Sequence, residues 1–488
     1  MGAGLSRRSA FAIVALAFWL VGLAFVRKLS IDESQYVAAA ALTSKGLLPY
    51  RDYAYLQTPL QPFVFAPLQW LFAGHVLIAT RLANALMGAG TMALVFGTAR
   101  RMGATGAAAL AAAAMLAVSE PFTWSAGVAR NDMLPALLMM SGLFTIAKRM
   151  TRGRMFGAGV AFGLAAGTKI SYSVPSAMVF LAAVWSSNAG ERRSALWFAV
   201  GVLAGLLPTL VLVLIAPQQF LAEAILFPAL GPEQYYTEIG KAWRLGPNRF
   251  LRLLIAAAIG PALIATIEIG RRSWAEPSRW LGDRRRRLVL AAAIGGLVSA
   301  ALNRPFQIFY LLPALPPLFV LAALLFGEAG RKPAWLKAVW AASVGAGLVP
   351  VGAWAVHALN AGIAPALDAQ RRADALGVAL RAQHIRGPIA TLAGQFVPDA
   401  RAKIDPRFAG GPFLYRTRGF ISQGEAREWH AVTRDQAGPL AEQPPAAFVT
   451  GDYPDVQPAQ EMELAEQARA LGYRPVATAN GLIIWAKR

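Results

Sequence analysis

The stretch IDESQYVAAAALTSKGLLPYRDYAYLQTPLQP, residues 31–62, determines how the rest of the chain is interpreted. It follows a strongly apolar segment, residues 11–26, and opens with two adjacent acids, Asp32 and Glu33. Acidic side chains at the mouth of a membrane span are costly to hold there and mark functional sites. The pattern predicts a small-residue helix over residues 36–44, followed by an aromatic, amide-rich loop. We interpret the stretch as the active-site loop of a membrane enzyme.

The composition is that of an integral membrane protein. Of the 488 residues, 56% are hydrophobic and 15% are charged, whereas water-soluble domains carry about 25% charged residues. The net charge of +21 would suit a nucleic-acid-binding protein, but the basic residues stand in short clusters between apolar runs, at 7–8, 100–101, 148–154, 192–193, 284–287 and 331–332. Clusters of this kind are typical of cytoplasmic loops. We therefore expect membrane lipid, and no nucleic acid, as a partner.

Apolar runs of roughly spanning length predict about eleven transmembrane helices. The runs fall near residues 10–28, 76–99, 103–118, 133–147, 155–168, 173–187, 195–216, 250–269, 288–302, 306–327 and 334–357. With residues 7–8 in the cytoplasm, this alternation places every basic cluster inside and both Asp32 and Asp132 outside. The sequence thus predicts a multi-pass protein of the inner (plasma) membrane with an extracytoplasmic active site. The apolar segment 62–73 contains two prolines and is predicted to lie in the membrane interface.

The character of the chain changes after Asn360. Residues 1–359 are predicted to form the transmembrane catalytic domain, with a first external loop at 29–75, and residues 360–488 a small soluble extracytoplasmic α/β domain. The expected helices lie at 368–384 and 460–471, and the expected strands at 388–392, 446–449 and 482–486. Acceptor binding and simple capping fit this domain equally well.

The acid pair has two interpretations. One carboxylate is a general base that takes the proton of an acceptor hydroxyl, or the pair caps the helix that follows, where negative charge is favourable. Either Asp32 or Glu33 could be the base.

Two other charged sites have two interpretations each. In Arg130-Asn131-Asp132, either the Arg–Asp pair anchors a helix end, or Asp132 shares a cavity with Asp32 while Arg130 faces an anion. Lys169, which follows a glycine-rich run, either extends to the interface or binds a lipid phosphate. Arg81 and Arg304, at the outer ends of predicted spans, are further candidates for binding phosphate.

The sequence contains no sign of a soluble cofactor. The chain has no cysteine, its four histidines show no metal-ligand spacing, and it has no glycine-rich phosphate loop ending in Gly-Lys-Ser/Thr. If the enzyme uses an activated donor, we expect that donor to be membrane-borne. We assign no cofactor, although a divalent metal that bridges the acids stays open.

Several segments resemble the GT-C glycosyltransferases. They are DESQY at 32–36, KGLLPYRDY at 45–53, TPL at 58–60, RND at 130–132, GLAAGTK at 163–169 and FYLLPALPPL at 309–318. In this order, over roughly residues 10–330, they are most similar to the family-39-like group, which includes protein O-mannosyltransferases and lipid A aminoarabinose transferases.

The resemblance implies a polytopic α-helical fold of the GT-C type. It also implies inverting transfer of a sugar from a polyprenyl-phosphate donor to an envelope glycan, lipid or protein on the extracytoplasmic face. By position, Asp32 corresponds to the catalytic acid, Glu33 to its companion and Asp132 to the acid of the second loop. A lipid monophosphate leaving group could be neutralised by guanidinium or ammonium groups without a metal.

The chain also departs from these relatives. Gln35 stands where the aminoarabinose transferases have an arginine, Thr58 where they have a lysine, and the HPP motif of the mannosyltransferases is absent. The sugar and the acceptor therefore cannot be carried over. The donor-phosphate cations are expected among Arg130, Lys169, Arg81 and Arg304, and the sugar or acceptor contacts among Tyr36, Tyr53, Tyr55 and Gln57.

Two other classes of protein fit some of these features. A transporter or lipid-linked glycan flippase would use the acids for ion coupling, and would often show internal repeats, which we do not find. A non-catalytic envelope scaffold would use the acid pair only as a helix cap.

Overall fold

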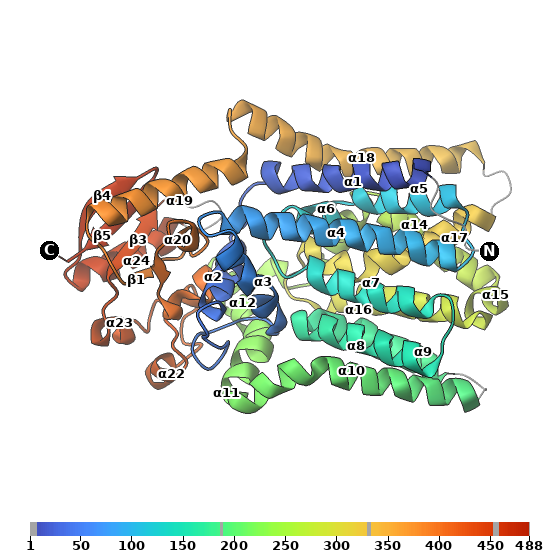
Figure 1. Cartoon of the computed structure of the whole chain (residues 1–488), viewed down its shortest axis with the longest axis horizontal. Coiled ribbons are helices and arrows are strands. Elements are labelled where there is room, and N and C mark those ends of the chain that lie inside the picture. Colours follow the sequence, from blue (N-terminus) through green and yellow to red (C-terminus); the bar gives the residue numbers. More distant parts are fainter. Residues whose placement is uncertain (1–6, 186–188, 329–332, 452–457, 488) are drawn as a thin grey trace.

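The structure is a computed structural model that describes residues 7–185, 189–328, 333–451 and 458–487. Apolar helices run side by side through most of the chain, and a smaller unit built on a β-sheet packs against one end of them (Figure 1). The first described helix begins at the opposite end of the bundle.

Each predicted apolar run contains helix. The helices are α1 (Arg7–Val26), α4 (Val76–Arg101), α5 (Gly106–Ala117), α7 (Met133–Ile146), α8 (Arg152–Thr168), α9 (Ser173–Val184), α10 (Ala189–Ile215), α13 (Asn248–Ala258), α14 (Ala262–Ala275), α16 (Arg284–Leu302), α17 (Leu315–Glu328) and α18 (Ala334–Asn360). Within the described ranges, five helices are long and apolar enough to cross a membrane, or up to seven if each bent pair counts as one span. The chain is a multi-pass membrane protein.

The predicted number of eleven spans stays a prediction. The helices α5, α7 and α9 contain only 12, 14 and 12 residues. At the rise of an α-helix they are about 18–21 Å long, which is shorter than the hydrocarbon core of about 30 Å.

The apolar run predicted near residues 250–269 is bent and does not form a single straight helix. Two helices, α13 and α14, meet there at 98°, at Gly260, whose φ of +120° is a conformation that favours glycine. A second break, of 69°, separates α5 from α6 (Glu120–Ala126). The two breaks touch, because the backbone N–H of Glu120 donates to the carbonyl of Ile259 at 3.3 Å. Hydropathy does not reveal the break at Gly260, because the apolar run continues across it.

Small residues let α8 and α10 cross closely. A Cβ added to Gly159 or Gly163 would lie 2.1–2.2 Å from backbone oxygens of α10, and one added to Gly201 or Gly205 would lie 2.1–2.3 Å from backbone oxygens of α8. Each helix thus carries two glycines four residues apart, and these glycines allow the two backbones to touch, as in membrane helix pairs.

The charges separate along the bundle. The end of α4 and the beginnings of α8, α10 and α16, which carry basic residues, lie at the end away from the sheet (Figure 1). The helices α2 (Glu33–Thr43), α3 (Leu60–Leu71) and α12 (Phe227–Glu238) lie at the end next to it. The helix predicted over residues 36–44 corresponds to α2, which begins three residues earlier than predicted, at Glu33.

The C-terminal region contains the expected mixture of helix and strand. Its elements are α19 (Pro365–Ala382), β1 (Pro388–Ala390), α20 (Phe396–Asp399), β2 (Lys403–Ile404), α21 (Gly411–Tyr415), α22 (Gln423–Glu428), α23 (Gly438–Glu442), β3 (Ala447–Gly451), α24 (Pro458–Ala470), β4 (Arg474–Ala479) and β5 (Leu482–Ala486). The sheet order is β2-β1-β3-β5-β4. β1 pairs in parallel with β2 and β3, whereas β5 is antiparallel to β3 and β4. The prediction missed β2 and β4, and the pairing of β4 with β5 shifts register between Pro475 and Ala477.

The C-terminal elements from α19 to β5, here called the sheet unit, share one hydrophobic core with the first loop. Tyr53 from the first loop and Val76 at the start of α4 belong to the same cluster of buried side chains as Phe396, Phe448 and Trp485. The sheet unit therefore packs directly on the loop that carries the acid pair.

Candidate active site

A cavity of about 620 Å³ lies where the apolar helices meet the sheet unit. Its walls come from the beginning of α2, the segments after α6 and α8, α12, the 3₁₀ turn Ile308–Ala314 and α21. Of the candidate residues named from the sequence, the cavity is lined by Asp32, Tyr36, Gln57, Arg130 and Lys169. Segments far apart in the sequence are thus brought to one site.

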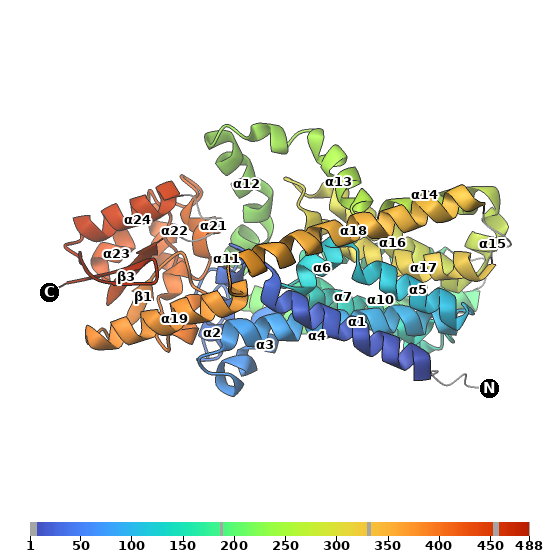
Figure 2. The same cartoon turned by 90° about the horizontal axis from the view of Figure 1, so that it is seen from above.

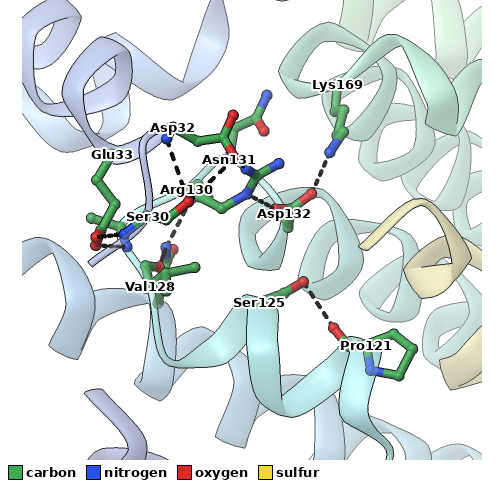
Figure 3. Close-up of polar contacts among 12 residues, drawn as sticks. Ser30, Asp32, Glu33, Pro121, Ser125, Val128, Arg130, Asn131, Asp132 and Lys169 are labelled. Carbon is green, nitrogen blue, oxygen red and sulfur yellow. Dashed lines mark hydrogen bonds and ion pairs between the residues drawn. The ribbon is translucent and has the colours of Figure 1, made fainter. Parts of the chain in front are cut away.

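Four charged side chains alternate in sign along one wall (Figure 3). Asp32 is ion-paired with Arg130, the Arg130 Nε donates to Asp132 Oδ2 at 2.7 Å, and Lys169 is ion-paired with Asp132. The Asp32 side chain is 18% exposed, whereas those of Arg130 and Asp132 are 2% exposed. Asp32 is therefore the carboxylate that faces the cavity, and Asp132 holds the two cations from behind.

Aromatic side chains cover these cations. The Arg130 guanidinium carbon lies 3.7 Å from the ring centre of Phe309, and the Lys169 Nζ lies 5.0 Å from the same ring and 5.4 Å from that of Tyr310. Such contacts are cation–π interactions. The FYLLPALPPL segment thus supplies the partners of cations from two other segments.

Hydrogen bonds fix the backbone that carries Arg130. The Asn84 Nδ2 donates to the carbonyls of Val128 at 2.6 Å and of Arg130 at 2.8 Å. The Asn131 Nδ2 donates to the carbonyl of Thr168 at 3.3 Å, next to Lys169. Because this segment is not helical, these side chains replace the backbone bonds that a helix would supply.

Glu33 and Arg81 lie outside the cavity, contrary to the roles expected for them. Glu33 receives two 2.7 Å hydrogen bonds from the Arg81 guanidinium, and its carboxylate also accepts from the backbone N–H groups of Ser30 and Ala129. The remaining Arg81 donors bind backbone carbonyls at the end of α1 and just after it. Both side chains are 0% exposed. This geometry leaves neither group available to a donor phosphate or an acceptor.

Tyr53 and Tyr55 pack inside the first loop instead of lining the cavity. The Tyr53 hydroxyl shares a 2.7 Å hydrogen bond with that of Thr43, and the Tyr55 hydroxyl donates to Gln61 Oε1 at 3.2 Å. The backbone N–H of Tyr55 donates to Glu223 Oε2 at 2.7 Å. Burial is the largest cause that raises the pKa of Glu223 well above its ordinary value. The expected sugar contacts are therefore reduced to Tyr36 and Gln57.

Arg304 also departs from its expected place. It is exposed at the end of α16 and does not line the cavity, although its neighbours Asn303 and Pro305 do.

Three cations of the cavity were not among the candidates from the sequence. They are Lys241 and Arg244, which follow α12, and Arg416, which follows α21. The predicted topology does place Lys241 and Arg244 on the same side of the membrane as Asp32 and Glu33. This placement could have identified the two cations as candidates from the sequence. No local pattern marks Arg416, because only the packing of the sheet unit brings it to the cavity.

Asp32, which lines the cavity, and Asp132, which lies behind it, are bridged by Arg130. In the part of the chain that the structure describes, no group of three or more histidine, aspartate or glutamate side chains is placed to hold a metal ion.

Comparison with known proteins identifies the fold. The sequence profile of glycosyltransferase family 87 matches residues 55–305, and a search of curated protein sequences gave no match. ArnT from Cupriavidus metallidurans bound to undecaprenyl phosphate is similar with a TM-score of 0.62 and 18% identity, over 98% of this chain and 98% of that one. Apo ArnT gives 0.58 and 18%, over 98% and 97%. The apo oligosaccharyltransferase of Archaeoglobus fulgidus gives 0.53 and 13%, over 92% and 70%. These likenesses show the GT-C fold.

Proposed function

The chain belongs to glycosyltransferase family 87, and from this premise we propose that it transfers a sugar from a polyprenyl-phosphate donor to an acceptor of the cell envelope. The observation that carries the proposal is the cavity in which one carboxylate, Asp32, stands against the cations Arg130 and Lys169. The basic clusters at the opposite end of the bundle support an extracytoplasmic site in the inner membrane.

Arg130 and Lys169 bind the donor phosphate. They are nearly buried, and Asp132 and the ring of Phe309 hold them in place. As the sugar leaves, the phosphodiester becomes a monophosphate and gains negative charge. Fixed cations in a site of low dielectric constant stabilise that charge in the transition state. The ArnT structure with undecaprenyl phosphate supports a lipid-phosphate donor for this fold.

Asp32 acts as the general base. It accepts the proton of the acceptor hydroxyl while the hydroxyl oxygen attacks the anomeric carbon. The bond from that carbon to the phosphate oxygen breaks, and its electron pair leaves with the phosphate, so that the configuration inverts. Arg130 is ion-paired with Asp32 in the structure. A donor phosphate gives Arg130 another anionic partner and leaves Asp32 available for the proton.

The other predicted residues divide into two groups. Tyr36 and Gln57 line the cavity and are positioned to contact the sugar. Asp132 positions the cations, and the Glu33–Arg81 pair positions the segment that carries Arg130, because Glu33 accepts from the N–H of Ala129.

The test compares the wild type with Asp32→Asn. The purified protein is given a panel of polyprenyl-phosphate sugars with envelope extract as the acceptor source, and released polyprenyl phosphate is measured by mass spectrometry. Loss of a general base typically lowers the rate about 10²–10⁴-fold, so we expect release by Asp32→Asn to fall by at least that lower factor.

Two controls accompany this measurement. Asp368→Asn changes a carboxylate on α19 that forms an ion pair with Arg372 near the surface, and should leave release unchanged. Asp32→Asn should still bind undecaprenyl phosphate, since the phosphate cations remain. Release of polyprenyl phosphate by Asp32→Asn at the wild-type rate would disprove the role of Asp32 as the general base. A transporter, which neither the family nor the fold supports, would move the lipid without forming a glycosidic bond.

A further inference from the structure

We infer that the cavity contains a second anion subsite, formed by Lys241, Arg244 and Arg416, which binds a phosphate or carboxylate group of the acceptor. The inference rests on the proposed function, since it assigns the chemical class of the acceptor.

Two of the three cations are stacked on tyrosine rings. The Arg416 guanidinium carbon lies 3.9 Å from the ring centre of Tyr235, and that of Arg244 lies 4.9 Å from the ring centre of Tyr236. The two ring centres are 5.2 Å apart. The two rings meet edge-on, at 69°, so the four side chains form one connected cluster that joins α12 to the sheet unit. Stacking fixes the planes of the guanidinium groups, whose N–H edges match the geometry of phosphate and carboxylate.

The stacked arginines lack internal partners for some of their donors. The Nε atoms of Arg244 and Arg416 are buried and make no hydrogen bond within the part of the chain that the structure describes. Among the described residues, no salt bridge is formed by Lys241, Arg244 or Arg416, whereas the nearby Arg418 and Arg434 both pair with Glu238 and Glu463. A buried donor without a partner is costly. An anion in the cavity would satisfy it.

The net charge of the cavity also supports a second anion subsite. Among the described residues, five cationic side chains line it and Asp32 is the one carboxylate that does, while Asp132 lies behind. The site therefore carries an excess of three positive charges. A polyprenyl-phosphate sugar is a phosphodiester with one negative charge, so most of the excess is left for a second anionic group.

The position of the subsite assigns it to the acceptor. Arg130 and Lys169 project from segments between the apolar helices, where a lipid donor enters. Lys241 and Arg244 follow α12, and Arg416 belongs to the sheet unit, which stands next to α12 beyond the ends of the bundle (Figure 2). An acceptor that approaches along the sheet unit meets these cations before it reaches Asp32.

The experiment measures binding, so it needs no transfer reaction. The full-length protein in phosphatidylcholine nanodiscs is titrated with glycerol 3-phosphate and, separately, with undecaprenyl phosphate. Arg244→Gln and Arg416→Gln are each expected to weaken glycerol 3-phosphate binding about tenfold, because each removes a charged hydrogen-bond donor. Undecaprenyl phosphate affinity should stay within about threefold of the wild type, which also shows that the variants fold. Arg416→Lys keeps the charge but not the fork of donors and should lie in between.

Arg418→Gln is the matched control, because Arg418 is two residues away and exposed and does not line the cavity. It should change neither affinity. A second arm places phosphatidylglycerol in the nanodiscs. Competition by this lipid in the wild type alone indicates an anion on a lipid headgroup, and binding of the soluble probe without competition indicates a soluble glycan.

Three results would overturn the inference. In the first, the glutamine variants lose undecaprenyl phosphate as strongly as glycerol 3-phosphate, which would assign the three cations to the donor. In the second, neither affinity changes. In the third, the wild type binds neither glycerol 3-phosphate nor phosphatidylglycerol. Failure of the transfer assay with intact anion binding would instead count against the proposed function alone.

Discussion

At the scale of single residues, Asp32 and Glu33 show how neighbours in sequence acquire different roles. Asp32 precedes the first residue of α2 and Glu33 is that residue. Because successive side chains on a helix are about 100° apart, the two carboxylates point to different surroundings. Asp32 faces the cavity, and Glu33 lies in the protein interior with Arg81. Only one member of the pair is therefore placed to meet a substrate.

The buried Glu33–Arg81 pair should contribute to stability and not to chemistry. We predict that Glu33→Gln and Arg81→Gln each lower the free energy of unfolding by about 3–5 kcal/mol, since removing one partner leaves a buried charge uncompensated. The double variant should cost less than the two single changes added together. Thermal unfolding in detergent, followed by tryptophan fluorescence, measures all three.

The exposed ion pair Arg51–Asp52 is the control for this comparison of single and double variants. Its Arg51 side chain is 51% exposed, so Arg51→Gln should change the free energy of unfolding by at most about 1 kcal/mol. A Glu33→Gln protein with wild-type stability but no transferase activity would show that Glu33 takes part in catalysis after all.

At the scale of elements, close contacts between helices and breaks within them build the bundle around the site. The crossing of α8 and α10 depends on glycines, and α8 ends at Thr168, directly before Lys169. The position of a phosphate-binding cation is thus set by the packing of a helix pair.

We predict that Gly163→Ala destabilises the protein, whereas Gly157→Ala on the same helix does not. A Cβ at Gly163 would lie 2.2 Å from the carbonyl oxygen of Val202, but a Cβ at Gly157 meets nothing within 4 Å. Overpacking typically costs about 1–3 kcal/mol, while alanine in place of an exposed helical glycine gains up to about 1 kcal/mol. Thermal unfolding of both variants checks the difference, and equal shifts would contradict the close crossing.

At the scale of the whole molecule, the sheet unit and the helix bundle are joined through the N-terminus of α4. The Asp399 carboxylate accepts hydrogen bonds from the backbone N–H of Val76 at 2.5 Å and of Leu77 at 3.2 Å. It therefore satisfies donors that begin a helix, from a residue more than 300 positions away. This contact and the shared core hold the sheet unit over the active-site loop.

Asp399 should make this junction sensitive to pH. Burial raises the pKa of Asp399 to about 6, against the opposing effect of its two backbone hydrogen bonds and of His75, while Asp374 adds to the rise. The folded protein thus holds this proton more tightly than the unfolded chain. The associated stability is fully present below about pH 4 and is lost as the pH rises through about 6. Across this pH range, the contribution of Asp399 to the free energy of unfolding changes by on the order of 3 kcal/mol.

The measurement compares the melting temperatures of the wild type and Asp399→Asn between pH 4 and pH 7. The wild type should lose stability relative to the variant as the pH rises, because the asparagine does not titrate. Other groups, such as Glu461 with a pKa raised by burial to about 7, titrate in both proteins and cancel in the difference. A constant difference across this range would contradict the raised pKa.

Much of this architecture could be predicted from local patterns. Apolar runs located the helices, the spacing of basic clusters separated the two ends of the bundle, and ordered motifs indicated a glycosyltransferase of the GT-C type. The structure places Asp32, Arg130 and Lys169, which were named as candidates from the sequence, around one cavity. The break at Gly260 was not predicted, and Arg81 was wrongly expected to face a phosphate.

The sequence by itself determined the membrane class, the positions of the helices and the segment that carries the acids. These properties follow from hydropathy and charge, which act along a local stretch of chain. Only the tertiary structure decided which acid faces the cavity, that Glu33 pairs with Arg81, and that Arg416 completes a cationic wall with Arg244. The physical reason is that a buried charge is stable only beside a partner, and folding alone brings partners together from distant segments.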